Sequence, residues 1–130
     1  MRDFRELKVW EKGHKMTLTS YQLTSGFPKQ ELFGLSSQIR RCSASIPANI
    51  AEGCGRVGNS ELHRFLQMAC GSASELEYQV LLATDLGYLG PEEYSRFDID
   101  INEVKKMLVA LIQKLDADTR GNGQGPSLSR

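Results

Sequence analysis

The histidines and cysteines, which can ligate a metal or act as a nucleophile or base, number five: His14, His63, Cys42, Cys54 and Cys70. Metal sites normally show short spacings such as C-x-x-C, H-E-x-x-H or E-x-x-H, because one turn or loop must hold two ligands together. C-x-x-C and H-E-x-x-H do not occur here, and E-x-x-H occurs once, at Glu11–His14, without the second copy that a metal site in a helix bundle requires. Helical position instead predicts that His14, Cys42 and Cys70 pack in or beside a core, whereas Cys54 falls in a turn where it could be exposed. We therefore predict no metal site.

Residues 53–58 read GCGRVG and match the pattern G-x-G-x-x-G. That pattern binds a dinucleotide only where a strand precedes it within a βαβ unit, and the segment before it here is helical in period. We interpret it as a turn between helices and expect no bound cofactor.

Catalysis is also poorly supported. Glu52 and Asp85 are plausible carboxylates, but neither stands in a recognisable spacing with a nucleophile or base. The prediction is that the chain has no catalytic residue and is not an enzyme.

The most structured polar pattern lies within residues 38–56. Polar residues recur there at steps of three and four, which places them on one helix face: Gln38, Arg41, Ser45, Asn49, Glu52 and Arg56. A neighbouring face carries short side chains, and Pro47 should bend the helix because proline lacks a backbone N–H. One interpretation is ordinary packing with a proline kink. The one that we favour is a subunit interface that uses both of these faces, Pro47 included, because polar groups bordering a core need partners.

Charge is balanced overall but not along the chain. Sixteen Lys and Arg match sixteen Asp and Glu, whereas residues 1–64 carry ten basic and six acidic residues and residues 65–130 the reverse. Such a division can attract one copy to another.

Basic residues that could contact phosphate are Lys8, Lys12, Arg40 and Arg64. The alternative is that they are solvated or paired with acids. Trp10 and Tyr21 are expected to point toward the core.

These residues must be positioned by helices. Apolar residues recur every three or four positions, and no segment alternates as a strand does. We predict helices at about 5–25, 31–55, 59–87 and 91–117, with Gly and Pro residues between them. Short connections favour an all-α, up-down-up-down antiparallel four-helix bundle over residues 1–117.

Residues 118–130 lack core-forming side chains and are predicted to be a disordered tail. An odd number of cysteines, no signal-like start and no long apolar run favour a cytoplasmic protein without a membrane partner.

Several blocks of the sequence resemble one known family. They are SIPANIAEG at residues 45–53, QIRR at 38–41, FLQMA at 65–69 and LGY at 86–88. They resemble the bacterial four-helix bundle family known as 23S rRNA intervening-sequence proteins or S23 ribosomal proteins. The resemblance covers roughly residues 3–115.

The resemblance implies a four-helix bundle that assembles into a homopentameric ring, with no established catalytic residues. A related branch looks like a basic accessory protein of retroelements that binds nucleic acid. This chain departs from the family at Gly13 and His14, where helix-favouring residues are usual, and Gly13 is expected to weaken the first helix by about 1 kcal/mol.

The leading hypothesis is therefore a non-enzymatic homo-oligomer that binds RNA or an RNA-containing assembly through basic residues of the ring. The alternative is an oligomeric scaffold for a protein partner, with no nucleic-acid role. Neutral net charge favours that alternative.

Overall fold

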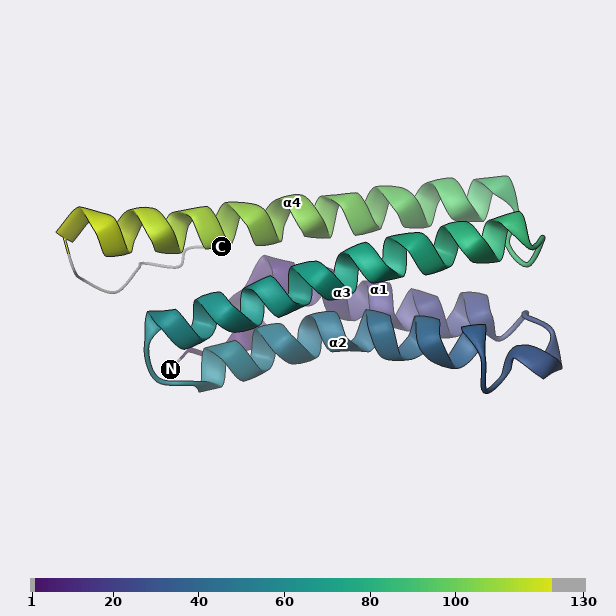
Figure 1. Cartoon of the computed structure of the whole chain (residues 1–130), viewed down its shortest axis with the longest axis horizontal. Helices are drawn as coiled ribbons and strands as arrows, with labels where there is room; N and C mark the ends of the chain where they lie inside the picture. The colour runs from purple at the N-terminus through teal and green to yellow at the C-terminus, as the bar shows by residue number, and fades with distance from the viewer. Residues whose placement is uncertain (1, 123–130) are drawn as a thin grey trace.

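Four α-helices make up most of the chain: α1 (Lys8–Thr24), α2 (Leu35–Gly55), α3 (Asn59–Asp85) and α4 (Pro91–Asn122). The structure is a computed structural model that describes residues 2–122. Short 3₁₀ turns at Phe4–Glu6 and Lys29–Glu31 precede α1 and α2, and these 121 residues contain no strand. The helices lie lengthwise beside one another, with α2 packed between α1 and α3, and α4 packed on α3 and α1 (Figure 1). The predicted all-α four-helix bundle is confirmed.

Side chains from neighbouring turns fix the helix ends. The Glu31 carboxylate accepts a hydrogen bond from the Leu35 backbone N–H at 3.1 Å, which satisfies a donor in the first turn of α2. Its other oxygen accepts the Tyr88 hydroxyl at 2.9 Å, and this bond raises the pKa of Tyr88. One carboxylate thus links the start of α2 to the turn after α3.

The turn after α3 depends on the positive backbone φ angle of one glycine. Gly87 has a φ of +82°, a backbone conformation that L side chains rarely adopt. It lets the backbone N–H of Tyr88 bond the carbonyl of Ala83 at 2.9 Å, which is a Schellman ending. Pro91 then begins α4, where its missing N–H costs nothing.

The core is formed by the apolar seams of all four helices. Its fully buried members are mainly branched aliphatic residues, with one phenylalanine; the largest are Phe97, Ile46, Ile50, Leu62, Leu66, Leu76, Ile101, Leu108 and Leu115. These belong to the recurring positions that defined the predicted helices. Burial of each such side chain contributes about 1.5–3 kcal/mol before the entropy of folding is subtracted.

The predicted helix ranges need small corrections, and one is larger. The regular helices α1 and α2 begin later than expected, at Lys8 and Leu35, because 3₁₀ turns occupy the preceding residues. The last helix continues to Asn122, so residues 118–122 of the predicted tail are helical. Figure 1 shows α4 extending past the other helices at this end. The rest of that predicted tail, residues 123–130, lies outside the described part of the chain.

Candidate functional site

The polar face of α2 lies along its border with α3. Ser45 Oγ lies 2.6 Å from Ser72 Oγ of α3, and Gln38 Oε1 accepts a hydrogen bond from Gln79 Nε2 at 3.3 Å. Gln79 is buried, yet its Oε1 has no hydrogen-bond partner within residues 2–122. Sequence reasoning found the α2 half of this border but missed Ser72 and Gln79, because a helix period does not say which neighbour a polar face meets.

The hydrogen bonds and ion pairs of the other members of the polar face lie within α2. Asn49 Nδ2 donates to the carbonyl of Ser45 at 2.8 Å, and Arg56 pairs with Glu52 at 3.3 Å within α2. Arg41 is exposed and makes no ion pair with any residue in 2–122. Polar residues 38–56 and their α3 neighbours Ser72, Glu75 and Gln79 are called the polar border below.

Pro47 lies elsewhere. Its ring is buried against α1 of the same chain, where a Cβ added to Gly13 would lie 3.6 Å from Pro47 Cδ. The face of short side chains on α2 is thus largely covered inside the bundle. For Pro47 the ordinary-packing interpretation therefore holds, and its side chain is not open to a second copy. Gly13, predicted only to weaken α1, is a point of close contact between α1 and α2.

A row of hydroxyl groups extends this contact along α1 and α2. The buried Ser20 and Ser43 hydroxyls lie 2.7 Å apart, and Arg40 Nε donates to Thr24 Oγ1 at 2.7 Å. These bonds satisfy polar groups that short side chains would otherwise leave buried and unpaired.

The four basic residues proposed to contact phosphate do not form one patch. Lys12 pairs with Glu103 of α4 at 2.8 Å, and Arg64 pairs with Glu61 of α3 at 3.1 Å, which lowers the pKa of the Glu61 carboxyl. Arg40 is held against α1, and Lys8 lines a 240 Å³ pocket between α1 and α4. Lys8 and Lys12 therefore share the border between α1 and α4, whereas Arg40 lies at the contact between α1 and α2 and Arg64 lies on α3.

Tyr21 and His14 of α1 are more accessible than predicted, whereas Trp10 packs against the core as expected. Tyr21 is 48% exposed, and the guanidinium of Arg40 lies 4.8 Å from its ring centre. The indole of Trp10 is half-buried, and the exposed imidazole of His14 stacks on it, with ring centres 5.1 Å apart and planes 6° apart. His14 is therefore not packed into the core. The i, i+4 spacing of Trp10 and His14 places the two rings on one helix face, so their contact could have been predicted from the sequence.

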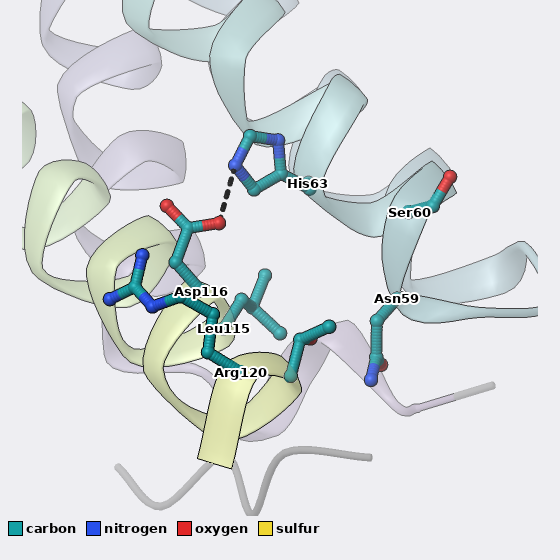
Figure 2. Close-up of a pocket in the computed structure, with 7 residues that line it drawn as sticks. Asn59, Ser60, His63, Leu115, Asp116 and Arg120 are labelled. Atoms are coloured by element: carbon teal, nitrogen blue, oxygen red, sulfur yellow. Dashed lines mark ion pairs between the residues drawn. The ribbon is translucent and has the colours of Figure 1, made fainter. Parts of the chain in front are cut away.

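One polar pocket of 430 Å³ lies between the start of α3 and the end of α4 (Figure 2). His63 Nε2 and Asp116 Oδ1 are 3.0 Å apart in it. Figure 2 shows the Ser60 hydroxyl directed away from the imidazole, so these three residues do not form a nucleophile–base–acid relay. The residues that line this pocket therefore show no arrangement for a covalent reaction.

The thiols are protonated and, in two cases, inaccessible. Burial raises the pKa of Cys42 to about 12, and it also raises the pKa values of Cys54 and Cys70. Cys54 is buried rather than exposed, because the N-terminal segment covers the end of α2: the Arg2 N–H bonds the Cys54 carbonyl at 2.8 Å. No group of three or more His, Cys, Asp or Glu side chains within residues 2–122 could hold a metal ion.

None of the helices among the described residues could cross a bilayer, because none contains an 18-residue stretch that is apolar enough.

Together these features define the class of the protein. It is an all-α four-helix bundle with a polar border between α2 and α3 and with a stacked Trp10–His14 pair on α1. Comparison with known proteins identifies the family of this chain. Residues 5–110 match the 23S rRNA-intervening sequence protein family, and the chain belongs to that family.

A solved structure supports this placement. A protein of unknown function from the S23 ribosomal protein family of Bacteroides thetaiotaomicron is 27% identical, with a TM-score of 0.76. The match covers 81% of this chain and 95% of the other. No curated protein matches significantly.

Proposed function

We propose that this chain is a non-enzymatic, cytoplasmic subunit of a homo-oligomer that binds RNA without a metal or cofactor. The subunit would be an up-down-up-down antiparallel bundle, and the oligomer a pentameric ring as the family resemblance implies. The observation that carries the assembly proposal is that Arg41, which is exposed at the polar border, has no ion-pair partner within residues 2–122.

The outer side of the polar border suits contact with another copy. Ala48 is exposed, and a side chain added at Gly71 would meet open space, so another backbone can approach closely. Arg41 lies on the same side as Glu52 and Glu75, and all three are exposed. A face that carries both signs of charge can pair with a second copy of itself or with a neighbouring face of the ring.

The assembly proposal is tested by light scattering at micromolar concentration. The wild type is expected to have the mass of an oligomer, and Ala48→Arg to shift it toward the monomer while circular dichroism stays unchanged. Ala117→Arg, a matched change on exposed α4, should leave the mass unaltered. A wild-type mass equal to one chain would overturn the proposal.

The RNA proposal is supported by arginines that lie against aromatic rings near α1. Arg5 lies 4.5 Å from the Phe4 ring centre, and Arg40 lies 4.8 Å from that of Tyr21. Arg5 pairs with Asp3, but both side chains are at least half exposed, so the pair is weak and Arg5 can exchange it for a phosphate. Repetition around a ring would raise avidity beyond that of one modest patch.

RNA binding is tested by fluorescence anisotropy with a labelled 12-nucleotide single strand at 50 and 200 mM salt. Two phosphate contacts, one each from Arg5 and Arg40, predict about a seven-fold loss of affinity over that range. Arg5→Ala should weaken binding and reduce the salt dependence, whereas Arg96→Ala, an exposed arginine of α4, should not. Absence of binding at both salt concentrations would overturn the RNA proposal.

A second function is favoured by apolar residues at one end of the bundle. Phe33 is 93% exposed, and Leu32 and Leu86 are each about half exposed. Side chains of this kind suit a protein-binding scaffold without a nucleic-acid role. Failure to bind RNA, together with an oligomeric mass, would favour this function over the first.

A further inference from the structure

We propose that the Trp10–His14 pair of α1 is a stacking site for an unpaired RNA base. This proposal deepens the proposed RNA function and rests on it. Phe4, Trp10 and His14 form a continuous row: the Phe4 and Trp10 ring centres are 4.8 Å apart in an edge-on arrangement, and the His14 ring lies nearly parallel to the indole.

The geometry of the row suits a flat ligand. His14 is exposed, and its ring is stacked on the half-buried indole that supports it. Bases of single-stranded nucleic acids stack on such aromatic side chains irrespective of base identity, because every base has a π-face. A base added to His14 would extend a stack that the protein has already ordered, so little conformational entropy would be lost.

Helical position places the row beside the α1–α2 contact. Gly13, Thr17 and Ser20 face α2, which puts Trp10, His14 and Tyr21 along the neighbouring outer margin of α1. Trp10 and Tyr21 are eleven residues apart, or about 16 Å along the helix. Arg5 and Arg40 lie at the two ends of this margin, each against an aromatic ring.

This combination favours RNA over a peptide as the occupant. A single RNA strand carries flat bases and phosphates together, and the margin offers ring faces between two guanidinium groups. The alternative, that another protein segment covers the row, is an outcome of the test below.

Trp10 is the only tryptophan of the chain, so its fluorescence reports on this site alone. A 12-nucleotide oligoadenylate is titrated into the full-length protein; anisotropy of a labelled copy measures binding, and Trp10 emission measures stacking with an unlabelled copy. We expect Trp10 emission to fall with the same saturation curve as anisotropy. His14→Ala should weaken binding by about five- to 150-fold.

Two variants separate stacking from other roles of His14. His14→Phe keeps an aromatic ring and should therefore bind RNA with most of the wild-type affinity. If His14 acted through a hydrogen bond or a charge, His14→Phe would bind as weakly as His14→Ala. His63→Ala removes the only other histidine and should bind like the wild type. Circular dichroism of each variant confirms that the bundle is intact.

The outcomes distinguish the two proposals. RNA binding with unchanged Trp10 emission and wild-type affinity in His14→Ala would overturn the stacking site and leave the RNA function in place. No binding of oligoadenylate at low salt would overturn both. Trp10 emission that changes when the oligomer is diluted, but not when RNA is added, would show that a second copy covers the row and would overturn the stacking site.

Discussion

The hydroxyl of Thr17 in α1 lies 3.0 Å from the backbone carbonyl oxygen of Ser43 in α2. In an uninterrupted helix this carbonyl would accept the N–H of residue 47, but residue 47 is proline and has none. A side chain from the adjacent helix therefore compensates for the hydrogen bond that Pro47 removes. The same hydroxyl also lies 2.8 Å from the carbonyl of Gly13, so its single proton has two acceptors within reach.

Thr17→Val is expected to lower the free energy of unfolding by about 1–2 kcal/mol, because it leaves the Ser43 carbonyl without its donor. In a Pro47→Ala background the same change should cost about 1 kcal/mol less, since the alanine restores a backbone N–H within α2. Urea denaturation of the four proteins measures this coupling. Thr19→Val, which removes a bond only to the Lys15 carbonyl of its own helix, serves as the control. Additive effects of Thr17→Val and Pro47→Ala would argue against the compensation.

Two buried glycines should respond oppositely to alanine. A Cβ at Gly13 would make ordinary contacts of 3.5 Å and 3.6 Å with Ile46 and Pro47, whereas one at Gly53 would lie only 2.9 Å from Phe65 Cβ. We expect Gly13→Ala to stabilise the protein by up to about 1 kcal/mol through helix propensity. Gly53→Ala should destabilise it by about 1–3 kcal/mol through overpacking. Thermal unfolding measures both, and a stabilised Gly53→Ala would contradict the packing described.

The ion pair between Lys105 of α4 and Glu77 of α3, at 2.9 Å, should make stability depend on pH. The hydrogen bond from Lys105 lowers the pKa of Glu77 below its ordinary 4.5 in the folded state. The resulting stabilisation is therefore present above pH 4.5 and is lost as the pH falls through the folded pKa.

Lys105→Met is accordingly expected to lower the free energy of unfolding at pH 7 by up to about 1 kcal/mol, because both side chains are about one-third exposed. The difference from wild type should shrink at pH 3. Urea denaturation at the two pH values measures it, with Lys106→Met, at an exposed neighbouring position, as the control. An equal loss at both pH values would assign the effect to packing.

The cysteines should differ in reactivity toward an aromatic disulfide reagent at pH 8. The thiolate is the reacting form, and burial raises the pKa of all three thiols. Cys70 is only half-buried and should react first, whereas Cys42 and Cys54 should react only as the bundle unfolds. Cys70→Ser should remove the fast phase, and urea should make the thiols react alike. Fast reaction of Cys54 instead would mean that the N-terminal segment opens readily.

Much of the architecture was predictable because it is local. The apolar recurrence at residues such as Leu66, Leu76 and Ile101 predicted helices, and glycine and proline marked the turns, so the confirmed four-helix bundle follows from these signals. The family was identified instead from sequence blocks such as SIPANIAEG at residues 45–53. The end of the last helix was placed too early, since residues 118–122 lack core-forming side chains but continue a helix that is already formed.

The sequence by itself thus determined which faces are apolar, polar or built from short side chains, because helix period alone sorts residues onto faces. Only the tertiary structure decided which helix each face meets. It covered Pro47 with Gly13, placed Ser45 against Ser72, separated Lys12 from Arg64 and left His14 exposed on Trp10. These outcomes depend on helix crossing and on contacts between residues distant in the chain, which no spacing along one helix encodes.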